Sequence, residues 1–202
     1  MKNIITTYGF IGTIQLIYFK LRTVLFHNQS RLIRFPITIR GKKFIDFGSS
    51  LTTGVGCRFE AYNSVNKSLI FGKNVQMNDY VHITAMNKVL IGDNVLMASK
   101  IYISDCTHGI YSGGVNESSP VENPIDRVYD LSEVIIEDNV WIGEFVSILP
   151  GVKIGKGSII GANTVVTKSI PENCIAIGAP AKIIKSYNFD LKRWVSVKKC
   201  SI

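Results

Sequence analysis

Three histidines are the side chains in this sequence best suited to move a proton near neutral pH, because an unperturbed imidazole titrates close to that range. His27 lies in the N-terminal region, where we expect it at the surface. His82 lies beside an apolar repeat position and points away from the core, where it could line a substrate site, although we expect a structural role. His108 lies in a long polar stretch. Because functional side chains concentrate in long loops on rigid scaffolds, His108 is the leading candidate for a general base.

A general base needs a neighbour that orients its ring. Asp105 precedes His108 by three residues, in a D-x-x-H pattern. Its carboxylate could accept a hydrogen bond from the imidazole and stabilise the charged form. The same aspartate could instead form an Asx-turn at the start of a loop. The sequence leaves both interpretations of Asp105 open.

Metal and disulfide chemistry are not indicated by the sequence. No two histidines form the H-x4-H pair that would give a zinc ion two ligands. The four cysteines are widely separated and show no C-x-x-C spacing: Cys57, Cys106, Cys174 and Cys200. We therefore predict no metal site and a reduced, cytosolic protein, in which Cys57 is buried as a small apolar residue.

The framework that must position these groups is a six-residue repeat. Aliphatic residues recur at every sixth position, namely Ile136, Ile142, Ile148, Ile154, Ile160 and Val166. A second set lies four residues further on: Val140, Val146, Val152, Ser158, Thr164 and Ile170. Neither an amphipathic helix nor an alternating strand has this period, which is typical of a hexapeptide solenoid. Three hexads would form one triangular coil with glycines such as Gly143, Gly155 and Gly161 at its corners, and stacked coils would share one core.

The repeat extends toward the N-terminus with one interruption. A looser series keeps the six-residue phase: Phe47, Thr53, Phe59, Val65, Phe71, Met77 and Ile83. The segments LIFGKNVQM, VLIGDNVLM and VIIEDNVWI, which begin at Leu69, Val89 and Val134, are three copies of one pattern. The last two are further apart than whole coils require. We therefore predict a loop at residues 104–133, which leaves the solenoid after Ile103 and carries His108.

The two ends of the chain differ from the repeat. Residues 4–26 are apolar but interrupted by glycines and charges, so we expect the segment to be too short and too broken to span a bilayer, and no signal-peptide cleavage site follows it. It could be a helix that caps the solenoid, or an interfacial helix whose basic residues meet lipid phosphates. We predict an N-terminal cap at 1–40, a β-helix at 41–185 and a C-terminal capping tail at 186–202.

Charge narrows the range of partners. The formal net charge is +8, which favours anionic partners. The basic residues are scattered and gather mainly at the two ends, without interleaved aromatic residues, so we expect no nucleic-acid binding. The basic N-terminus would suit peripheral contact with an anionic bilayer.

The run NVWIGEFVSILPGVKIGKGSIIGANTVVTKSIP, followed by GAPAKIIK, resembles the C-terminal signature of the hexapeptide-repeat acyltransferases. The resemblance covers Gly72 to Lys185. The segments DCTHGIY, IDRVYDL and YNFDLKRW are most similar to the branch that O-acetylates sugars of bacterial surface polysaccharides. This resemblance implies an all-β fold, a left-handed parallel β-helix, in a homotrimer that binds acetyl-CoA in the grooves between neighbouring prisms.

The resemblance also implies roles on the acceptor side. His108 would take the proton of a sugar hydroxyl that attacks the thioester, and acetyl would pass directly, without an acyl-enzyme. Glu144 stands where many members carry Ser or Ala, and it could orient His108, bind acceptor hydroxyls or face solvent. Asn78 matches an asparagine near the acceptor hydroxyl, unless it is a left-handed corner residue. Tyr111 would contact the acceptor, and Arg127 could contact an anionic acceptor or the CoA phosphates, or equally form a structural salt bridge.

On the donor side, the resemblance implies that Trp141 lines the pantetheine arm, although this residue could equally pack between subunits. The N–H of Gly143 would stabilise the oxyanion. The other acetyl-CoA contacts are expected along the coil edge and at one cationic end, where each lysine could instead be an ordinary solvated charge: Ala162, Thr167, Lys168, Pro180, Lys182 and Lys185.

Other functions of the same solenoid are weighed against this prediction. A γ-type carbonic anhydrase would need the histidine pair that is missing. An N-acetyltransferase of nucleotide-linked amino sugars commonly carries an extra nucleotide-binding unit, for which we find no G-x-G-x-x-G motif. A non-catalytic hexapeptide scaffold would keep the prism without the base. We predict a cytoplasmic, acetyl-CoA-dependent O-acetyltransferase, which could work at the inner face of the cytoplasmic membrane.

Overall fold

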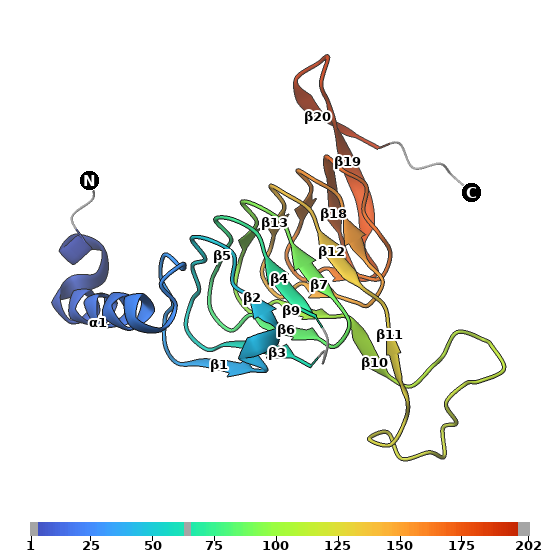
Figure 1. The fold of residues 1–202 in the computed structure, drawn as a ribbon. Coiled ribbons are helices and arrows are strands. Elements are labelled where there is room, and N and C mark those ends of the chain that lie inside the picture. Colours follow the sequence, from blue (N-terminus) through green and yellow to red (C-terminus); the bar gives the residue numbers. More distant parts are fainter. Residues whose placement is uncertain (1–3, 63–65, 198–202) are drawn as a thin grey trace.

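The computed structural model describes residues 4–62 and 66–197 and shows a prism of stacked coils with a helix at one end and a long loop at one side (Figure 1). Within these ranges, the strands of successive coils pair in parallel and form three sheets, which are the sides of the prism. This architecture confirms the predicted left-handed parallel β-helix.

Each side of the prism is one sheet. In spatial order, the six-stranded sheet contains β1 (Ile37–Arg40), β3 (Cys57–Ala61), β6 (His82–Ala85), β9 (Tyr102–Ser104), β14 (Ser147–Ile148) and β17 (Val165–Val166). The five-stranded sheet contains β15 (Lys153–Ile154), β12 (Val134–Ile136), β7 (Val89–Ile91), β4 (Leu69–Phe71) and β2 (Ile45–Asp46), which follows the short 3-10 helix η1 (Lys42–Phe44). The seven-stranded sheet contains β20 (Arg193–Ser196), β19 (Lys182–Asn188), β18 (Cys174–Ile177), β16 (Ile159–Ile160), β13 (Trp141–Ile142), β8 (Leu96–Met97) and β5 (Gln76–Met77).

The inward-facing residues of all three sheets form one continuous core. Every aliphatic position of the main hexad series is buried, from Ile136 to Val166. The looser series is buried as well, except that Phe47 is half-buried against the core and Val65 lies outside the described residues. Glycine is needed where stacked corners touch: a Cβ on Gly143 would lie 2.6 Å from the backbone nitrogen of Ala162. The hexad phase therefore predicts the core.

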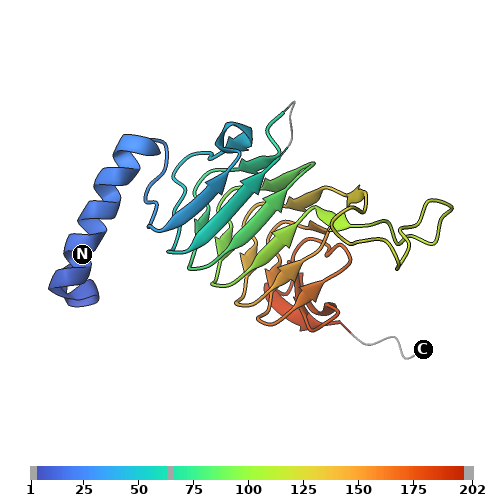
Figure 2. The same cartoon turned by 90° about the horizontal axis from the view of Figure 1, so that it is seen from below.

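The N-terminal helix α1 (Ile4–Phe26) lies across the first coil and touches it along one side (Figure 2). It bends at Gly9, where φ is 68°. Phe19 and Thr23 are buried, and the Thr23 hydroxyl accepts a 2.8 Å hydrogen bond from the backbone N–H of Ile33. Most other apolar side chains of α1 are exposed. By length and composition α1 could cross a membrane, which differs from our expectation for this segment.

The domain boundaries predicted at residues 40/41 and 185/186 fall at the end of β1 and inside β19. β1 pairs in parallel with β3, so the first coil begins before residue 41. At the other end, β19 pairs antiparallel with β18, and β20 pairs antiparallel with β19, so the solenoid ends in a hairpin that extends the seven-stranded sheet (Figure 1). Residues 198–202 of the predicted tail lie outside the described residues.

Candidate functional site

The long loop leaves the six-stranded sheet directly after β9, as the sequence predicts. Its base is an antiparallel ribbon of β10 (Cys106–His108) and β11 (Tyr129–Leu131), in which His108 faces Tyr129. The ring centroids of these two residues are 4.6 Å apart. Below the ribbon, the backbone N–H of Ser132 donates a 2.9 Å hydrogen bond to the carbonyl of Asp105 and closes the neck of the loop. His108 is therefore exposed but sits on paired, regular backbone.

Asp105 has a different role from the orienting role that its spacing suggests. It is fully buried, and its Oδ1 accepts a hydrogen bond from the backbone N–H of Met86. Its Oδ2 accepts from the N–H groups of Asn87 and Lys88, at 2.7 and 2.6 Å. The carboxylate thus binds three donors of the corner between β6 and β7, rather than the imidazole of His108. This bonding matches neither of the two interpretations from the sequence, because it joins consecutive coils instead of orienting His108 or forming an Asx-turn at the start of the loop.

The backbone of His108 is held by two loop residues that we expected to contact the acceptor. The Tyr111 hydroxyl donates a 2.7 Å hydrogen bond to the His108 carbonyl and accepts one of 2.7 Å from Arg127 Nη1. Arg127 Nη2 also donates to the carbonyls of Pro120 and Glu122. Arg127 is thus committed to contacts within the loop, and Tyr111 links it to His108.

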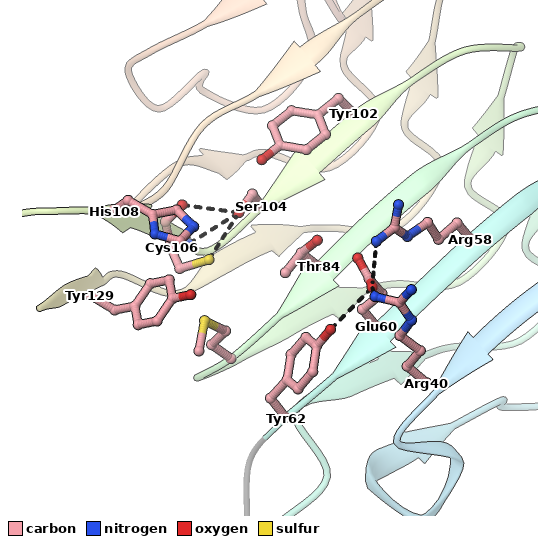
Figure 3. Close-up of a pocket in the computed structure, with 11 residues that line it drawn as sticks. Arg40, Arg58, Glu60, Tyr62, Thr84, Tyr102, Ser104, Cys106, His108 and Tyr129 are labelled. Atoms are coloured by element: carbon pink, nitrogen blue, oxygen red, sulfur yellow. Dashed lines mark hydrogen bonds and ion pairs between the residues drawn. The ribbon is translucent and has the colours of Figure 1, made fainter. Parts of the chain in front are cut away.

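A pocket of about 420 Å³ lies between the ribbon and the outer face of the six-stranded sheet (Figure 3). Its floor is made by outward-facing residues of β3, β6 and β9. His108, Cys106 and Tyr129 form one wall, and Arg40 and Tyr62 lie opposite them. The complete lining is Arg40, Arg58, Glu60, Tyr62, Thr84, Met86, Tyr102, Ser104, Cys106, His108 and Tyr129.

Glu60 is the centre of a polar network on this floor. Its Oε1 accepts hydrogen bonds from Arg40 Nη1 and Arg58 Nη2, both at 2.7 Å, and from the Tyr62 hydroxyl at 3.1 Å. Its Oε2 lies 3.0 Å from Nε2 of His82. Burial alone would raise the pKa of this carboxyl, but the hydrogen bonds from Arg58, His82 and Tyr62 outweigh burial and lower the pKa to about 2. Glu60 is therefore an ionised carboxylate with a 5% exposed side chain.

Sequence reasoning missed this network because its members come from separate coils. Parallel pairing places Arg40 beside Glu60, Glu60 beside Thr84, and Thr84 beside Ser104. A neighbouring outward row contains Arg58, His82 and Tyr102. Polar residues at outward positions of consecutive coils were the available signal, but reading it requires the register between coils.

The expectations for His27 and for the cysteines can be checked directly. His27 is half-buried rather than at the surface, because its ring packs against Phe47 with centroids 5.1 Å apart; burial and the nearby Lys42 lower its pKa. Cys57 is buried, as predicted, and burial raises its pKa to about 11. Cys57, Cys106 and Cys174 are free thiols, whereas Cys200 lies outside the described residues. Among the described residues, no three His, Cys, Asp or Glu side chains are grouped closely enough to bind a metal.

Three further candidates lie at the corner between the seven-stranded and six-stranded sheets, away from His108. Glu144 is exposed and is not one of the described residues that line the His108 pocket. Asn78 is also exposed, and the left-handed residue of its corner is Tyr80, with φ 58°. The N–H of Gly143 donates a 2.8 Å hydrogen bond to the carbonyl of Ile160. The prediction that this N–H stabilises an oxyanion is therefore wrong, because the coil ladder already uses it.

The predicted donor residues are distributed over another side of the prism. Pairing aligns Leu96, Trp141, Ile159, Ile175 and Lys185 in one row across the seven-stranded sheet. The Leu96 and Trp141 side chains are 46% and 51% exposed, so the row is an apolar stripe on the outer surface with a lysine at its end. We call these five residues the apolar stripe.

The remaining donor candidates are exposed around the last coils. Ala162 follows the corner of β16, Pro180 lies between β18 and β19, and Lys182 begins β19. Thr167 and Lys168 lie at a different corner, where β17 of the six-stranded sheet ends. Within one chain, His108 and the apolar stripe thus belong to two different sides of the prism.

The fold and the repeat are shared with known acyltransferases. A family profile described as bacterial transferase hexapeptide (six repeats) matches residues 133–168. Over 187 residues the chain is 46% identical to an Escherichia coli K12 protein, provisionally named lipopolysaccharide biosynthesis O-acetyl transferase WbbJ, covering 93% of this chain and 94% of the relative. The galactoside O-acetyltransferase of Escherichia coli K12 is 36% identical over 127 residues, or 63% of this chain and 58% of that protein.

Solved structures give the same result. A galactoside acetyltransferase in complex with coenzyme A has a TM-score of 0.53 at 33% identity and covers 75% of this chain and 72% of its own. AntD, an N-acyltransferase from Bacillus cereus, has a TM-score of 0.66 at 21% identity over 81% of this chain and 84% of its own, which shows the shared fold alone. The hexad core, the coil architecture and the near full-length relative together place this chain in the hexapeptide-repeat acyltransferase family.

Proposed function

We propose that the protein is an acetyl-CoA-dependent O-acetyltransferase that modifies a sugar hydroxyl of a bacterial surface polysaccharide or its precursor. The observation that carries this proposal is the position of His108, which lies on a paired ribbon at the wall of a polar pocket beside three tyrosines. The pocket is within the usual size range of small-molecule sites. The relatives named for O-acetyl transfer to lipopolysaccharide and galactosides support a sugar as the acceptor.

In the proposed reaction, His108 accepts the proton of the acceptor hydroxyl while the hydroxyl oxygen forms a bond to the acetyl carbon. The carbon–sulfur bond of acetyl-CoA then breaks, and the thiolate leaves. The proton held by His108 passes to that sulfur, so the enzyme is unchanged and no acyl-enzyme forms. The contacts of Tyr111 and Tyr129 support this role, because they fix the backbone and the ring of the base.

The separation of His108 from the apolar stripe supports a homotrimer with shared sites. Acetyl-CoA would lie along the stripe of one subunit, with its phosphates near Lys182 and Lys185. The base would come from His108 of the neighbouring subunit. An exposed apolar row also needs a partner, either a ligand or another subunit.

The first test is the variant His108→Ala in the full-length protein. We expect turnover of acetyl-CoA with a sugar acceptor to fall by about 10²-fold or more, with nearly unchanged acetyl-CoA binding in a thermal-melt titration. Near-normal turnover would remove His108 as the base. Absence of both turnover and acetyl-CoA binding in a folded wild-type protein would favour a non-catalytic scaffold, and turnover on amino sugars alone would favour N-acetylation.

Shared sites can be tested by mixing subunits. Trimers of His108→Ala and trimers of Trp141→Ala should each have low activity. Co-refolding the two variants should restore activity, because some interfaces then combine an intact histidine with an intact stripe. Failure of the mixture to exceed both parents would show that the site lies within one subunit.

We also propose that α1 binds the inner face of the cytoplasmic membrane. Phe10, Ile11 and Leu25 are 71%, 81% and 74% exposed, which is unusual for large apolar side chains on one element. A groove beside the helix combines apolar lining from Leu16 and Ile17 with basic residues such as Lys20, Arg31 and Arg34. Apolar surface flanked by cations fits an anionic bilayer.

Vesicle co-sedimentation tests this proposal. The protein should bind phosphatidylglycerol vesicles more strongly than phosphatidylcholine vesicles, and Ile11→Asp with Leu25→Asp should abolish binding without changing turnover of a soluble acceptor. Val115→Asp with Val121→Asp, in the exposed loop, is the matched control. Equal binding by both double variants would overturn the membrane role of α1.

A further inference from the structure

We infer that the acceptor carries an anionic group, a carboxylate or a phosphate, and that Arg40 and Arg58 bind this group at the end of the pocket opposite His108. The inference rests on the proposed function, since it assumes that the pocket beside His108 holds the acceptor. It adds the chemical class of that acceptor, which the His108 geometry does not define.

The first observation is the charge of the network. Two guanidinium groups share one carboxylate oxygen, Glu60 Oε1, at 2.7 Å each. Glu60 is ionised because its pKa is about 2, so two positive charges face one negative charge. Among these three groups the pocket floor therefore has an excess of one positive charge. A bound anion would balance this charge and reduce the repulsion between the two arginines.

The second observation is that the arginines are held but not saturated. Each guanidinium has five N–H donors in a fixed fork, and the contacts with Glu60 use one nitrogen of each. The side chains of Arg40 and Arg58 remain 57% and 44% exposed. Donors are thus available on the pocket side, where planar carboxylate or phosphate groups bind in a bidentate manner.

The third observation is preorganisation. A buried carboxylate is expensive unless several donors compensate it, and here it is placed under two surface arginines rather than in the core. Holding long side chains in one orientation before binding lowers the entropy cost of recognition. Glu60 therefore acts as a positioning residue for both guanidinium groups.

The rest of the pocket fits a sugar ring between the two ends. Tyr62, Tyr102 and Tyr129 surround the space between the arginines and His108 (Figure 3). Aromatic side chains with hydroxyl groups offer both apolar contact and hydrogen bonds. A sugar whose anionic group binds the arginines would present a hydroxyl at the far end of its ring to His108.

Matched acceptors test this inference in the full-length protein. Galactose, galacturonate and galactose 1-phosphate share one ring and differ in charge, and thiol release from acetyl-CoA reports turnover. We expect kcat/KM for at least one anionic sugar to exceed that for galactose by tenfold or more. The better of the two anionic sugars would distinguish a carboxylate from a phosphate acceptor.

Arg40→Gln and Arg58→Gln should raise the KM for the preferred anionic sugar about tenfold, so that its advantage over galactose is lost, and leave the KM for acetyl-CoA unchanged. Arg193→Gln, at an exposed position of the distant hairpin strand β20, is the matched control. Equal use of neutral and anionic sugars, or a preference that survives both pocket variants, would overturn the anion site while leaving acetyl transfer intact.

Binding measurements test the anion site independently of the proposed acetyl transfer. Isothermal titration with galacturonate and galactose 1-phosphate requires no chemistry. Binding that is lost in Arg58→Gln, in a protein without acetyl transfer, would support the anion site and overturn the proposed function. If neither anionic sugar binds the folded wild-type protein and turnover occurs with galactose, the anion site is wrong and the proposed function stands.

Discussion

The Tyr111 hydroxyl donates a 2.7 Å hydrogen bond to the backbone carbonyl of His108, and Arg127 in turn donates to that hydroxyl. The two residues that the sequence analysis assigns to acceptor contact are thus supports of the base in this structure. Because the pair is on an exposed loop, its effect should be on the placement of His108 rather than on global stability.

Tyr111→Phe removes this hydrogen bond and keeps the ring. A net hydrogen bond contributes about 0.5–1.5 kcal/mol, so we expect kcat to fall about twofold to tenfold with an unchanged melting temperature. Steady-state kinetics and calorimetry measure both quantities. Tyr80→Phe, at an exposed corner, is the control. An increase in acceptor KM with unchanged kcat would instead favour direct contact of Tyr111 with the acceptor.

Gly109→Ala should also lower kcat, because the added Cβ would displace the Tyr111 hydroxyl. Gly109 has φ 111°, and a Cβ at this position would collide with the Tyr111 hydroxyl. We expect both the backbone strain and the displaced hydroxyl to lower kcat more than Tyr111→Phe does. Gly114→Ala is the control, because its Cβ would have 3.7 Å to the nearest atom, the Ser112 hydroxyl. Equal activity of the two alanine variants would contradict this prediction.

Variants of Asp105 distinguish a structural role of this residue from a catalytic role. Asp105→Ala removes the buried carboxylate that accepts from the N–H groups of Met86, Asn87 and Lys88. We expect the free energy of unfolding to fall by about 3 kcal/mol or more, measured by urea denaturation. Asp105→Asn should lose less stability and, below its melting temperature, keep most of its kcat. A large loss of kcat in a stable Asp105→Asn protein would restore the orienting role.

Glu60 should make stability depend on pH in the acid range. Its folded pKa of about 2 lies below the ordinary value of 4.5, so its contribution is fully present above pH 4.5 and is lost as the pH falls toward 2. We expect wild type to exceed Glu60→Gln by on the order of 3 kcal/mol at pH 6, with the difference shrinking below pH 4.5. The control is the same substitution in the exposed loop, Glu122→Gln. A pH-independent difference would contradict the low pKa.

The variant Trp141→Ala tests whether the apolar stripe binds acetyl-CoA. Trp141→Ala removes a half-exposed indole from the outer face of β13. If the stripe binds acetyl-CoA, the KM for acetyl-CoA should rise about tenfold while the proposed trimer remains intact. Gel filtration and kinetics on the same preparation distinguish this result from subunit packing, which predicts dissociation instead.

The core and the loop could be predicted from the sequence because both follow from the hexad period. A residue such as Ile142 must point inward if Ile136 and Ile148 do, and an excess of residues between Val89 and Val134 must leave the prism. Asp105 could not be assigned, because its partners lie in the previous coil. The pocket was missed for a related reason: Glu60 pairs with Arg40 in one direction and Thr84 in the other, and the two coils differ in length.

The hydrogen-bonded neck allows the sequence of the loop to change while the solenoid coil that carries the loop stays the same. Val134 pairs with Val89 in the same way as Val89 pairs with Leu69 one coil earlier, although only the later coil carries the loop. The Ser132–Asp105 hydrogen bond closes the gap between the base of the ribbon and the coil. Residues 109–128 can therefore be exchanged as a cassette without changing the winding of the solenoid. Evolution, or a protein engineer, could therefore vary the residues that support His108 while the solenoid and the pocket floor stay unaltered.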